Sequence, residues 1–230
     1  MKTIGLLGGM TWHSTIDYYR LINSGVQARL GGSISARCVL YSVEFGEIEK
    51  LQASGEWAAL SEIMADSARR IERAGADVLL ICANTMHRAA EAVEAAVSIP
   101  LLHIVDATAH EIQRRGLNRV GLLGTRFTME QDFYRGRLKT RHGLEVLVPD
   151  EAAREAVHDI IYNELGHGII NDASRDIYKS IIDTLAAAGA EGVILGCTEI
   201  PMLIRPQDSQ FPLFDTTAIH AAAAVDWALT

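Results

Sequence analysis

The sequence is poor in cysteine and has no long apolar run. Only three cysteines occur among its 230 residues, Cys38, Cys82 and Cys197. An odd and small number of cysteines favours the reduced thiols of the cytosol over the disulfide framework of a small secreted domain. No apolar stretch reaches the roughly 18 residues of a membrane-spanning helix, and the apolar segment 2–8 is too short for a signal peptide. We therefore expect a cytoplasmic protein with no membrane partner.

Basic clusters and metal-ligand spacings are missing as well. The chain carries 21 basic and 29 acidic residues, a net charge of −8, and has no run of Lys or Arg. This balance excludes the extended basic surface of a nucleic-acid-binding protein. The eight histidines show no metal-ligand spacing, and Gly8-Gly9 lacks the full glycine pattern of a dinucleotide-binding loop. The sequence thus predicts no metal site, no cofactor and no nucleic-acid partner.

What the sequence does have is an alternation of short apolar runs with segments of helical periodicity. Strands separated by helices are typical of parallel sheets with right-handed crossovers. A chain of 230 residues that is 49% hydrophobic suffices for one large α/β domain or two smaller lobes. The patterns predict strands at 2–8, 37–45, 77–81, 101–105, 119–123, 145–148 and 192–195, and helices at 15–30, 57–74, 129–142, 151–166 and 172–188.

A weak repeat divides the chain into two similar halves. Three segments return in the same order: 2–8 at 118–124, 74–83 at 188–197, and the Pro-Leu segment of 100–106 at 212–215. Chance similarity among α/β strands is the alternative. We predict an α/β fold of two similar, doubly wound parallel-sheet lobes related by a pseudo-twofold axis. Lobe one would comprise 1–103 plus 212–230, and lobe two 104–211.

The loops after the repeated strands form the predicted active site. Ligands of open α/β sheets bind beyond the carboxyl ends of the strands. In two similar lobes that face each other, these ends meet at one cleft between the lobes. The candidate site loops are therefore 8–14, 82–87, 124–128 and 196–200.

Cys197 is the strongest candidate for chemistry. It directly follows an apolar strand, where the N-terminus of the next helix lowers the pKa of a thiol and favours the thiolate. A small buried hydrophobic residue is the alternative for such a cysteine. The repeat aligns Cys197 with Ala83, and Gly196 with Cys82. Because successive residues leaving a strand point in different directions, we expect Cys82 to pack behind the loop. Cys38, inside a strand pattern, is also expected to pack.

Four motifs stand out along the chain. They are Gly-Leu-Leu-Gly-Gly-Met at 5–10, Cys-x-Asn-Thr at 82–85, Leu-Gly-Thr-Arg at 123–126 followed by Thr-Met-Glu-Gln, and Gly-Cys-Thr-Glu-Ile-Pro at 196–201. Together they resemble the aspartate/glutamate racemase family, above all its enterobacterial-type members, over nearly the whole chain. The resemblance implies two cysteine-bearing lobes with the site between them, and chemistry without metal or pyridoxal phosphate. Many members of the family form dimers, so a homodimer is expected.

The reaction of the family explains why two thiols are used. Racemisation removes a proton from one face of the substrate α-carbon and delivers another to the opposite face. Cysteine suits both steps because its pKa of about 8.5 is easily tuned. The family's first thiol directly precedes Asn-Thr, whereas that position here is Ala83, which can neither give nor take a proton.

The resemblance also implies which residues contact the substrate. Asn84, Thr85 and Thr198 match the hydrogen-bond donors that hold the α-carboxylate as charge develops on it. Met10 and Gln52 fall at substrate-side positions of the family. A simple strand–helix turn is the alternative for Met10, and an ordinary surface glutamine for Gln52. In addition, Thr125 mirrors Gly9 in the repeat and is expected to line the cleft from the other lobe.

These observations predict a cofactor-independent racemase or epimerase of an acidic amino acid, aspartate or glutamate, with Cys197 as the acid/base thiol. One alternative is a one-thiol enzyme that protonates a single face, as the arylmalonate decarboxylases of the same superfamily do. Another is an amino-acid-binding protein with weakened catalysis. His87 is either a proton relay or a structural histidine. Asp106 and Asp215 are expected to cap the helices that follow them, with a role beside the thiol as the alternative.

Overall fold

The computed structural model describes residues 1–230, and the chain divides into two compact units. Unit 1 comprises Met1–Ile104 and His220–Thr230, and unit 2 comprises Val105–Ile219. The sequence placed 212–219 in lobe one, whereas these residues lie in unit 2. The strand that follows Pro212 pairs inside the sheet of unit 2. The repeated Pro-Leu segment therefore precedes the last strand of each sheet. The chain returns to unit 1 only at His220.

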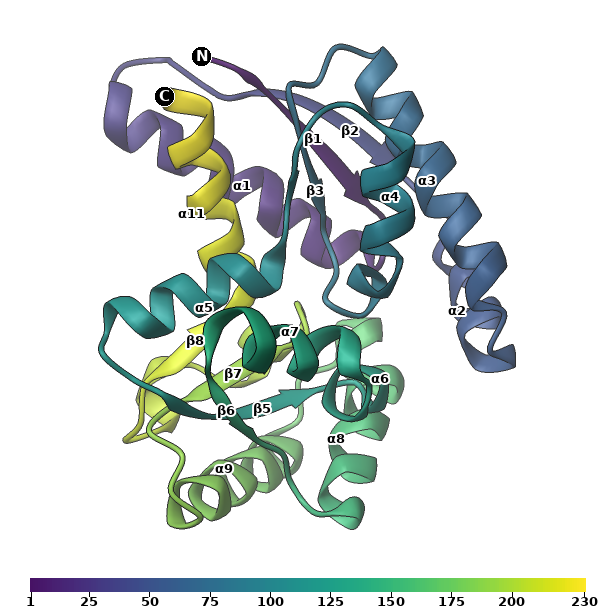
Figure 1. Cartoon of the computed structure of the whole chain (residues 1–230). Coiled ribbons are helices and arrows are strands. Elements are labelled where there is room, and N and C mark those ends of the chain that lie inside the picture. The colour runs from purple at the N-terminus through teal and green to yellow at the C-terminus, as the bar shows by residue number, and fades with distance from the viewer. The chain divides into compact units, whose positions relative to one another are not determined.

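Each unit contains one four-stranded parallel sheet (Figure 1). The strands of unit 1 are β1 (Thr3–Gly8), β2 (Arg37–Ser42), β3 (Val78–Ile81) and β4 (Leu101–Leu102), and those of unit 2 are β5 (Arg119–Gly124), β6 (Glu145–Leu147), β7 (Val193–Gly196) and β8 (Leu213–Asp215). Their orders are β2-β1-β3-β4 and β6-β5-β7-β8. The same order in both units confirms the predicted α/β class with two similar parallel sheets.

Helices cover both faces of the unit 1 sheet (Figure 1). One face packs against α1 (Trp12–Leu30) and the part of α11 (Thr216–Leu229) that belongs to unit 1. The other face packs against α3 (Trp57–Arg73), with α2 (Phe45–Ser54), η1 (Thr85–Ala89) and α4 (Ala90–Ala96) beside it. Leu6 of β1 faces the α1 side and Leu7 the α3 side. Burial on both faces explains why these strands read as continuous apolar runs.

The unit 2 sheet is covered in the same way (Figure 1). On one side lie α8 (Glu151–Asn163) and α9 (Asp172–Ala187), and on the other α5 (Ile104–Arg114) and α7 (Asp132–His142). The shorter elements of the unit are α6 (Arg126–Glu130), η2 (Leu165–His167), α10 (Ile200–Leu203) and η3 (Pro206–Asp208).

The two candidate capping aspartates behave differently. Asp215 is a cap, because its Oδ1 accepts the N–H of Ala218 at 3.0 Å. Asp106 lies inside the first turn of α5, and its carboxylate joins α5 to α7. It accepts two hydrogen bonds from Arg137, at 2.7 and 2.5 Å, and lies 2.9 Å from Nε2 of His142.

Three predicted elements are wrong in their bounds. The strand at 37–45 ends at Ser42, because the Glu44 carboxylate accepts the N–H groups of Gly46 and Glu47 and starts α2. The strand at 101–105 is limited to two residues, since α5 begins at Ile104. The helix at 129–142 is two helices, α6 and α7, separated by extended backbone at Gln131. The remaining predicted elements occur at nearly the expected bounds.

None of the helices combines the length and the apolar character that crossing a lipid bilayer requires.

Candidate active site

Cys197 follows β7 directly and is held against a carboxylate. The residue is 8% exposed. Its Sγ donates a hydrogen bond to Oε2 of Glu199 at 3.1 Å, and the hydroxyl of Thr198 donates to the same oxygen at 2.7 Å. Glu199 is itself buried. One oxygen of the Glu199 carboxylate thus accepts hydrogen bonds from the side chains of both preceding residues.

The surroundings of Cys197 move its pKa in the direction opposite to the sequence expectation. Burial raises the pKa of the thiol well above its ordinary value, and the charge of Glu199 raises it further. The backbone N–H groups of Glu199 and Thr198 lower the pKa, as a helix N-terminus does, but they are outweighed. Because α10 has only four residues, it supplies little helix dipole. The resting thiol is therefore protonated.

One further residue of unit 2, Tyr178, interacts electrostatically with the thiol, and sequence reasoning missed it. Tyr178 of α9 is fully buried. Its pKa is raised well above the ordinary value by burial, by the charge of Cys197 and by that of Glu164. Glu164 Oε2 also accepts the hydroxyl of Ser174 at 2.7 Å. Tyr178 reads in the sequence as one of several apolar-face residues of a helix, so no signal marks it as a neighbour of Cys197.

Thr125 occupies the loop beside that of Cys197. β5 and β7 are neighbours, and Gly124 pairs with Gly196 at their ends. A Cβ on Gly124 would lie 2.7 Å from the carbonyl oxygen of Gly196, so a glycine is needed for this approach. Thr125 is buried and its Oγ1 accepts the N–H of Thr128 at 3.3 Å, which caps α6. The structure therefore brings two predicted site loops, 124–128 and 196–200, side by side in unit 2.

The predicted site residues of unit 1 gather at the ends of β1 and β3. Ala83, Asn84 and Thr85 follow β3 after Cys82 and are all buried. Met10 and Ala83 belong to the same buried apolar cluster. These positions follow adjacent strands, as the paired site loops of unit 2 do.

Gln52 is a buried residue of unit 1, so the alternative of an ordinary surface glutamine is excluded. It is 5% exposed, and its Nε2 donates to Sδ of Met86 at 3.2 Å. Met86 in turn packs in the cluster that contains Met10 and Ala83. The side chain of Gln52 thus points toward the residues that follow β1 and β3.

The loop between β1 and α1 is fixed by a threonine. Oγ1 of Thr15 accepts the N–H of Gly9 at 2.8 Å and donates to the carbonyl of Thr11 at 2.9 Å. Gly9 has φ +93°, a conformation that favours glycine. Met10 is therefore held in a constrained loop whose ends are both tied to the first turn of α1.

His87 is fully engaged by backbone groups. Its Nδ1 donates to the carbonyl of Ala83 at 2.8 Å, and its Nε2 accepts the N–H of Ile104 at 3.2 Å. Both ring nitrogens are therefore used with the ring neutral. This arrangement favours the structural role over the proton relay, and it ties the loop at Ala83 to the end of unit 1.

Cys82 and Cys38 are packing residues in this structure. Cys82 is completely buried in the cluster on the α1 side of the sheet, and Cys38 packs against the same cluster. Burial raises the pKa of Cys38 to about 11 and that of Cys82 further still. Neither thiol forms a disulfide. At neutral pH both are held as thiols, the unreactive form.

A comparison with known proteins identifies the family to which these loops belong. The model of the Asp/Glu/Hydantoin racemase family matches residues 7–224. The chain belongs to this family.

Individual relatives of this racemase agree over long stretches. A solved structure from Yersinia pestis, described as a candidate Asp/Glu racemase, is 55% identical over the full length of both chains, with a TM-score of 0.93. An aspartate racemase homologue from Pyrococcus horikoshii is 35% identical, again over both full chains, with a TM-score of 0.86. The broad-specificity amino-acid racemase RacX of Bacillus subtilis is 27% identical over 72% of this chain and 71% of RacX. The protein is thus an isomerase, an amino-acid racemase.

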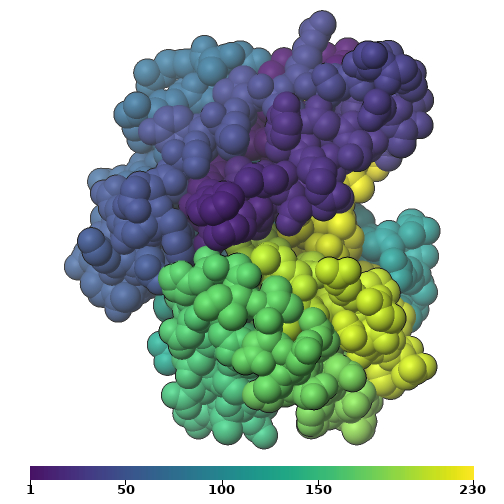
Figure 2. Space-filling model, turned by 180° about the vertical axis from the view of Figure 1, so that it is seen from behind, coloured from purple at the N-terminus to yellow at the C-terminus, as the bar shows by residue number.

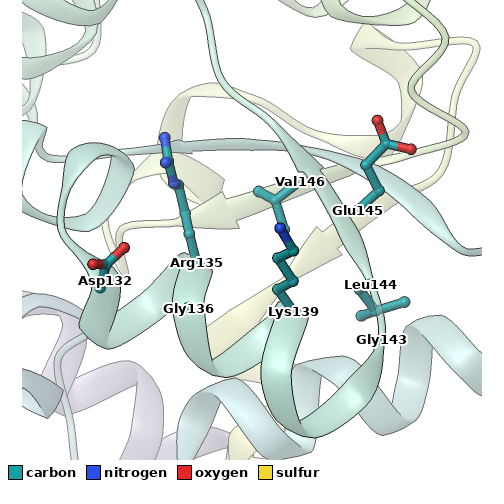
Figure 3. A pocket seen from close by; sticks show the side chains of 8 residues that line it. All are labelled: Asp132, Arg135, Gly136, Lys139, Gly143, Leu144, Glu145 and Val146. Atoms are coloured by element: carbon teal, nitrogen blue, oxygen red, sulfur yellow. The ribbon is translucent and has the colours of Figure 1, made fainter.

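The racemase also has a surface hollow lined by residues of unit 2 (Figure 3). Its volume is about 400 Å³, and it lies in unit 2 between α7 and β6. Figure 3 shows Arg135 and Lys139 projecting from the same side of α7. The lining residues are Asp132, Arg135, Gly136, Lys139, Gly143, Leu144, Glu145 and Val146. None of them is a predicted site residue.

The side chains of the racemase provide no ready metal centre. No group of three or more His, Cys, Asp or Glu side chains is arranged to hold a metal ion.

Proposed function

We propose that this racemase removes and returns the α-proton of an acidic amino acid, aspartate or glutamate, with Cys197 as the acid/base and without a cofactor. The observation that carries the proposal is the 3.1 Å contact between Sγ of Cys197 and Oε2 of Glu199. It pairs a buried thiol with a carboxylate able to hold the thiol proton. The acidic side chain of the substrate rests on the resemblance of the motifs to those of aspartate/glutamate racemases.

The proposed reaction begins with a neutral thiol, because its pKa is raised. Glu199 takes the proton of Cys197, and the thiolate then removes the proton from Cα. The electron pair left on Cα spreads into the substrate α-carboxylate, where hydrogen-bond donors stabilise the charge. We assign this stabilising role to Asn84, Thr85 and Thr198. The proposal requires that these residues of the two units act on one substrate molecule.

Position 83 makes the proposed reaction unequal on the two faces of the substrate. Proton return from Cys197 restores the starting enantiomer, whereas inversion needs a proton delivered to the opposite face. Ala83 offers only a methyl group, and it belongs to the same buried apolar cluster as Met10 and Met86. We therefore propose fast exchange of the α-proton with retention for one enantiomer, and slow inversion that uses water or a more distant group.

Proton NMR in D₂O tests the proposal directly. We expect the α-proton signal of one enantiomer of aspartate or glutamate to disappear faster than the other enantiomer accumulates. Cys197→Ser is the control and should lose both processes. Absence of α-proton exchange in either enantiomer of both amino acids contradicts the proposal and leaves an amino-acid-binding role.

The apolar surroundings of Ala83 favour one second candidate, an enzyme that protonates a single face after loss of carbon dioxide. In that reaction the C–C bond to a carboxylate breaks, carbon dioxide leaves, and Cys197 donates its proton to the resulting carbanion. The substrate would be a disubstituted malonate. Release of carbon dioxide from such a malonate, with no exchange in the amino acids, distinguishes this candidate from the racemase.

We also propose that the enzyme works in the cytoplasm as a homodimer. Its three cysteines are free thiols, the state that a reducing compartment maintains.

A further inference from the structure

Helix α7 is strongly basic in a chain that is acidic overall. Its eleven residues contain four of the chain's 21 Lys and Arg residues and a single acidic residue, whereas the whole chain carries a net charge of −8. In the same unit, α8 and α9 each carry more acidic than basic residues, and they belong to the light green part of the surface in Figure 2. Like charges four residues apart repel each other on a helix, so α7 needs negative charge nearby.

The cations of α7 differ in the negative charge that the fold gives them. Arg137 is paired with Asp106 of α5 through two hydrogen bonds, and its side chain is 15% exposed. The guanidinium of Arg135 has no such partner and donates to the carbonyl oxygen of Met129 at 3.3 Å. The ammonium group of Lys139 is exposed and forms neither a hydrogen bond nor an ion pair with another residue. Two neighbouring positive charges of α7 are therefore left without a carboxylate.

Both of these cations line the hollow between α7 and β6. They are four residues apart, so they project from the same side of the helix, as Figure 3 shows. The opposite wall is β6, an edge strand that pairs only with β5. The N–H of Glu145 points toward β5 and donates to the carbonyl of Asn118 at 2.9 Å. Because backbone groups of successive strand residues point to opposite sides, the N–H of Val146 is directed away from β5, at the open edge of the sheet.

The two carboxylates that line the hollow are not equivalent either. Glu145 is paired with Arg119, whose Nε lies 3.2 Å from its Oε1. Asp132 forms no ion pair. In the view of Figure 3, Asp132 lies on one side of the two cations and Glu145 on the other. The charges of the hollow that the chain itself does not compensate are thus two positive and one negative.

A ligand complementary to these charges carries two negative groups and one positive group. An amino acid with an acidic side chain has this pattern at neutral pH, with two carboxylates and one ammonium group. Guanidinium and ammonium groups both bind carboxylates through charge-assisted hydrogen bonds. The volume of the hollow, about 400 Å³, also lies within the range of small-molecule sites, about 300 to 1,000 Å³.

We propose that this hollow binds a free acidic amino acid, aspartate or glutamate. The two carboxylates of the ligand lie against Arg135 and Lys139, and one of them also accepts the N–H of Val146. Its ammonium group lies against Asp132. The hydrogen bond from Arg135 to Met129 holds the guanidinium in place before the ligand arrives, which lowers the entropic cost of binding. This site is additional to the proposed active site, and the argument for it rests on the charges of the hollow and not on the proposed reaction.

Titration of the full chain with glutamate, followed by ¹H–¹⁵N NMR, tests the proposal. The Cys197→Ser variant is used so that the ligand is not converted during the measurement. We expect the N–H signal of Val146 to shift in a saturable manner. Lys139→Gln and Arg135→Gln should each raise the dissociation constant at this signal at least about tenfold, because each loses a charge-assisted hydrogen bond. Arg141→Gln is the matched control and should leave the dissociation constant unchanged, since Arg141 is exposed on the same helix but does not line the hollow.

Glutarate, which is glutamate without its ammonium group, tests the chemical class of the ligand. It should bind about threefold more weakly than glutamate or worse, and Asp132→Asn should abolish this difference. Glutarate or inorganic phosphate that binds as tightly as glutamate shows a site for anions in general and overturns the proposal. A Val146 signal that glutamate does not move overturns it as well. Either result leaves the proposed reaction intact, because α-proton exchange is measured separately in the unmodified protein.

Discussion

At Cys197 the local turn and the wider surroundings act on the thiol in opposite directions. Two backbone N–H groups favour the thiolate, whereas burial and the Glu199 carboxylate favour the thiol. The balance gives a protonated cysteine beside a base. In the proposed reaction the thiolate forms as Glu199 takes the proton of Cys197. One buried negative charge then moves from the carboxylate to the thiol, and no second negative charge is created. Burying two adjacent negative charges would be far more costly.

The three cysteines should therefore differ sharply in their effect on activity. We expect Cys197→Ser to lower the rate of α-proton exchange about a hundredfold or more, because an alcohol is a much poorer acid/base than a thiol. Cys38→Ser and Cys82→Ser should spare most of the activity, since both thiols are packed in the core. Exchange rates of the three variants, measured by NMR, decide the matter. If Cys82→Ser is as damaging as Cys197→Ser, Cys82 is a second catalytic thiol.

Removal of the carboxylate should change the pH dependence of the reaction. Glu199→Gln keeps the shape of the side chain but cannot accept the proton of Cys197. It also removes the charge that raises the pKa of the thiol, which falls as a result. We expect a loss of about a hundredfold near neutral pH and a partial recovery as the pH rises, when solvent deprotonates the thiol. Glu199→Asp is the matched control. An unchanged rate in Glu199→Gln at neutral pH shows that the proton is held elsewhere.

A thiol at position 83 should improve inversion. Ala83→Cys supplies an acid/base at the position that aligns with Cys197 in the repeat, and general acid–base groups contribute roughly a hundred- to ten-thousand-fold. We expect inversion to accelerate more than exchange with retention, measured by chiral chromatography alongside NMR. Ala83→Ser is the control of similar size. Equal exchange and inversion in the unmodified protein, together with no gain from Ala83→Cys, would contradict the proposed inequality of the two faces.

At the scale of elements, buried histidines join the strands of unit 1 to the helix that closes it. His220 of α11 is completely buried. Its Nδ1 accepts the hydroxyl of Tyr18 at 2.8 Å, and its Nε2 donates to the carbonyl of Leu102 at 2.8 Å. The ring of His87 lies 5.8 Å from that of His220, and 4.5 Å from that of His103. One histidine thus connects α1, the end of β4 and α11.

This burial makes the free energy of unfolding depend on pH. Burial lowers the pKa of His220 to about 4, below the 6.5 of an exposed histidine, so the ring is neutral in the folded chain. The unfolded chain binds a proton at higher pH than the folded chain does. The contribution of His220 to the free energy of unfolding is therefore fully present above about pH 6.5. It falls by about 3 kcal/mol in total as the pH drops toward about 4.

A glutamine at position 220 tests the effect. His220→Gln can still donate and accept but does not titrate, so it should lower stability at neutral pH and remove part of the loss in acid. Urea unfolding at about pH 7 and about pH 5 measures both effects. His167→Gln is the control, because His167 is exposed. An identical acid loss in His220→Gln and in the unmodified protein assigns the pH dependence to other groups.

Sequence patterns predicted the sheets well because each strand carries its own signal. The apolar runs of β1, β3, β5 and β7 are continuous because these strands are buried on both faces. The repeat aligned the end of β1 with that of β5, and the end of β3 with that of β7. The pattern failed at α2, where the apolar run passes from strand to helix and neither glycine nor proline lies between Ser42 and Phe45. The start of α2 depends on Glu44, whose side chain caps the helix but belongs to a type that rarely does so.

The helix that the sequence did not predict, α2, also carries a predicted substrate contact. Without α2, the pattern left Gln52 open between a substrate contact and a surface residue. With α2 in place its side chain is buried against Met86. The sequence could not predict the direction of the pKa shift at Cys197 for a similar reason. The shift depends on burial of the thiol, which only the packed fold creates. Glu199 was visible in the motif two residues later, but its contact with the thiol is a property of the turn.

At the scale of the whole molecule, the proposed reaction uses neither a metal ion nor an organic cofactor. The residues proposed for it are one thiol, one carboxylate and neutral hydrogen-bond donors. We expect activity to survive exhaustive chelation and the absence of pyridoxal phosphate, with the α-proton exchange assay as the measurement. A loss that a metal ion or pyridoxal phosphate restores contradicts the cofactor-free reaction.

The division of the chain also sets an order for its biosynthesis. Unit 2 is one uninterrupted segment, whereas unit 1 needs residues 220–230, which the ribosome adds after all of unit 2. Ala221, Ala224 and Val225 of α11 complete the core on the α1 side of the first sheet. During translation the α1 side of the first sheet therefore stays uncovered until α11 is made, while unit 2 is free to fold first. Until residues 220–230 are synthesised, this face of residues 1–104 stays accessible to chaperones that recognise exposed apolar surface.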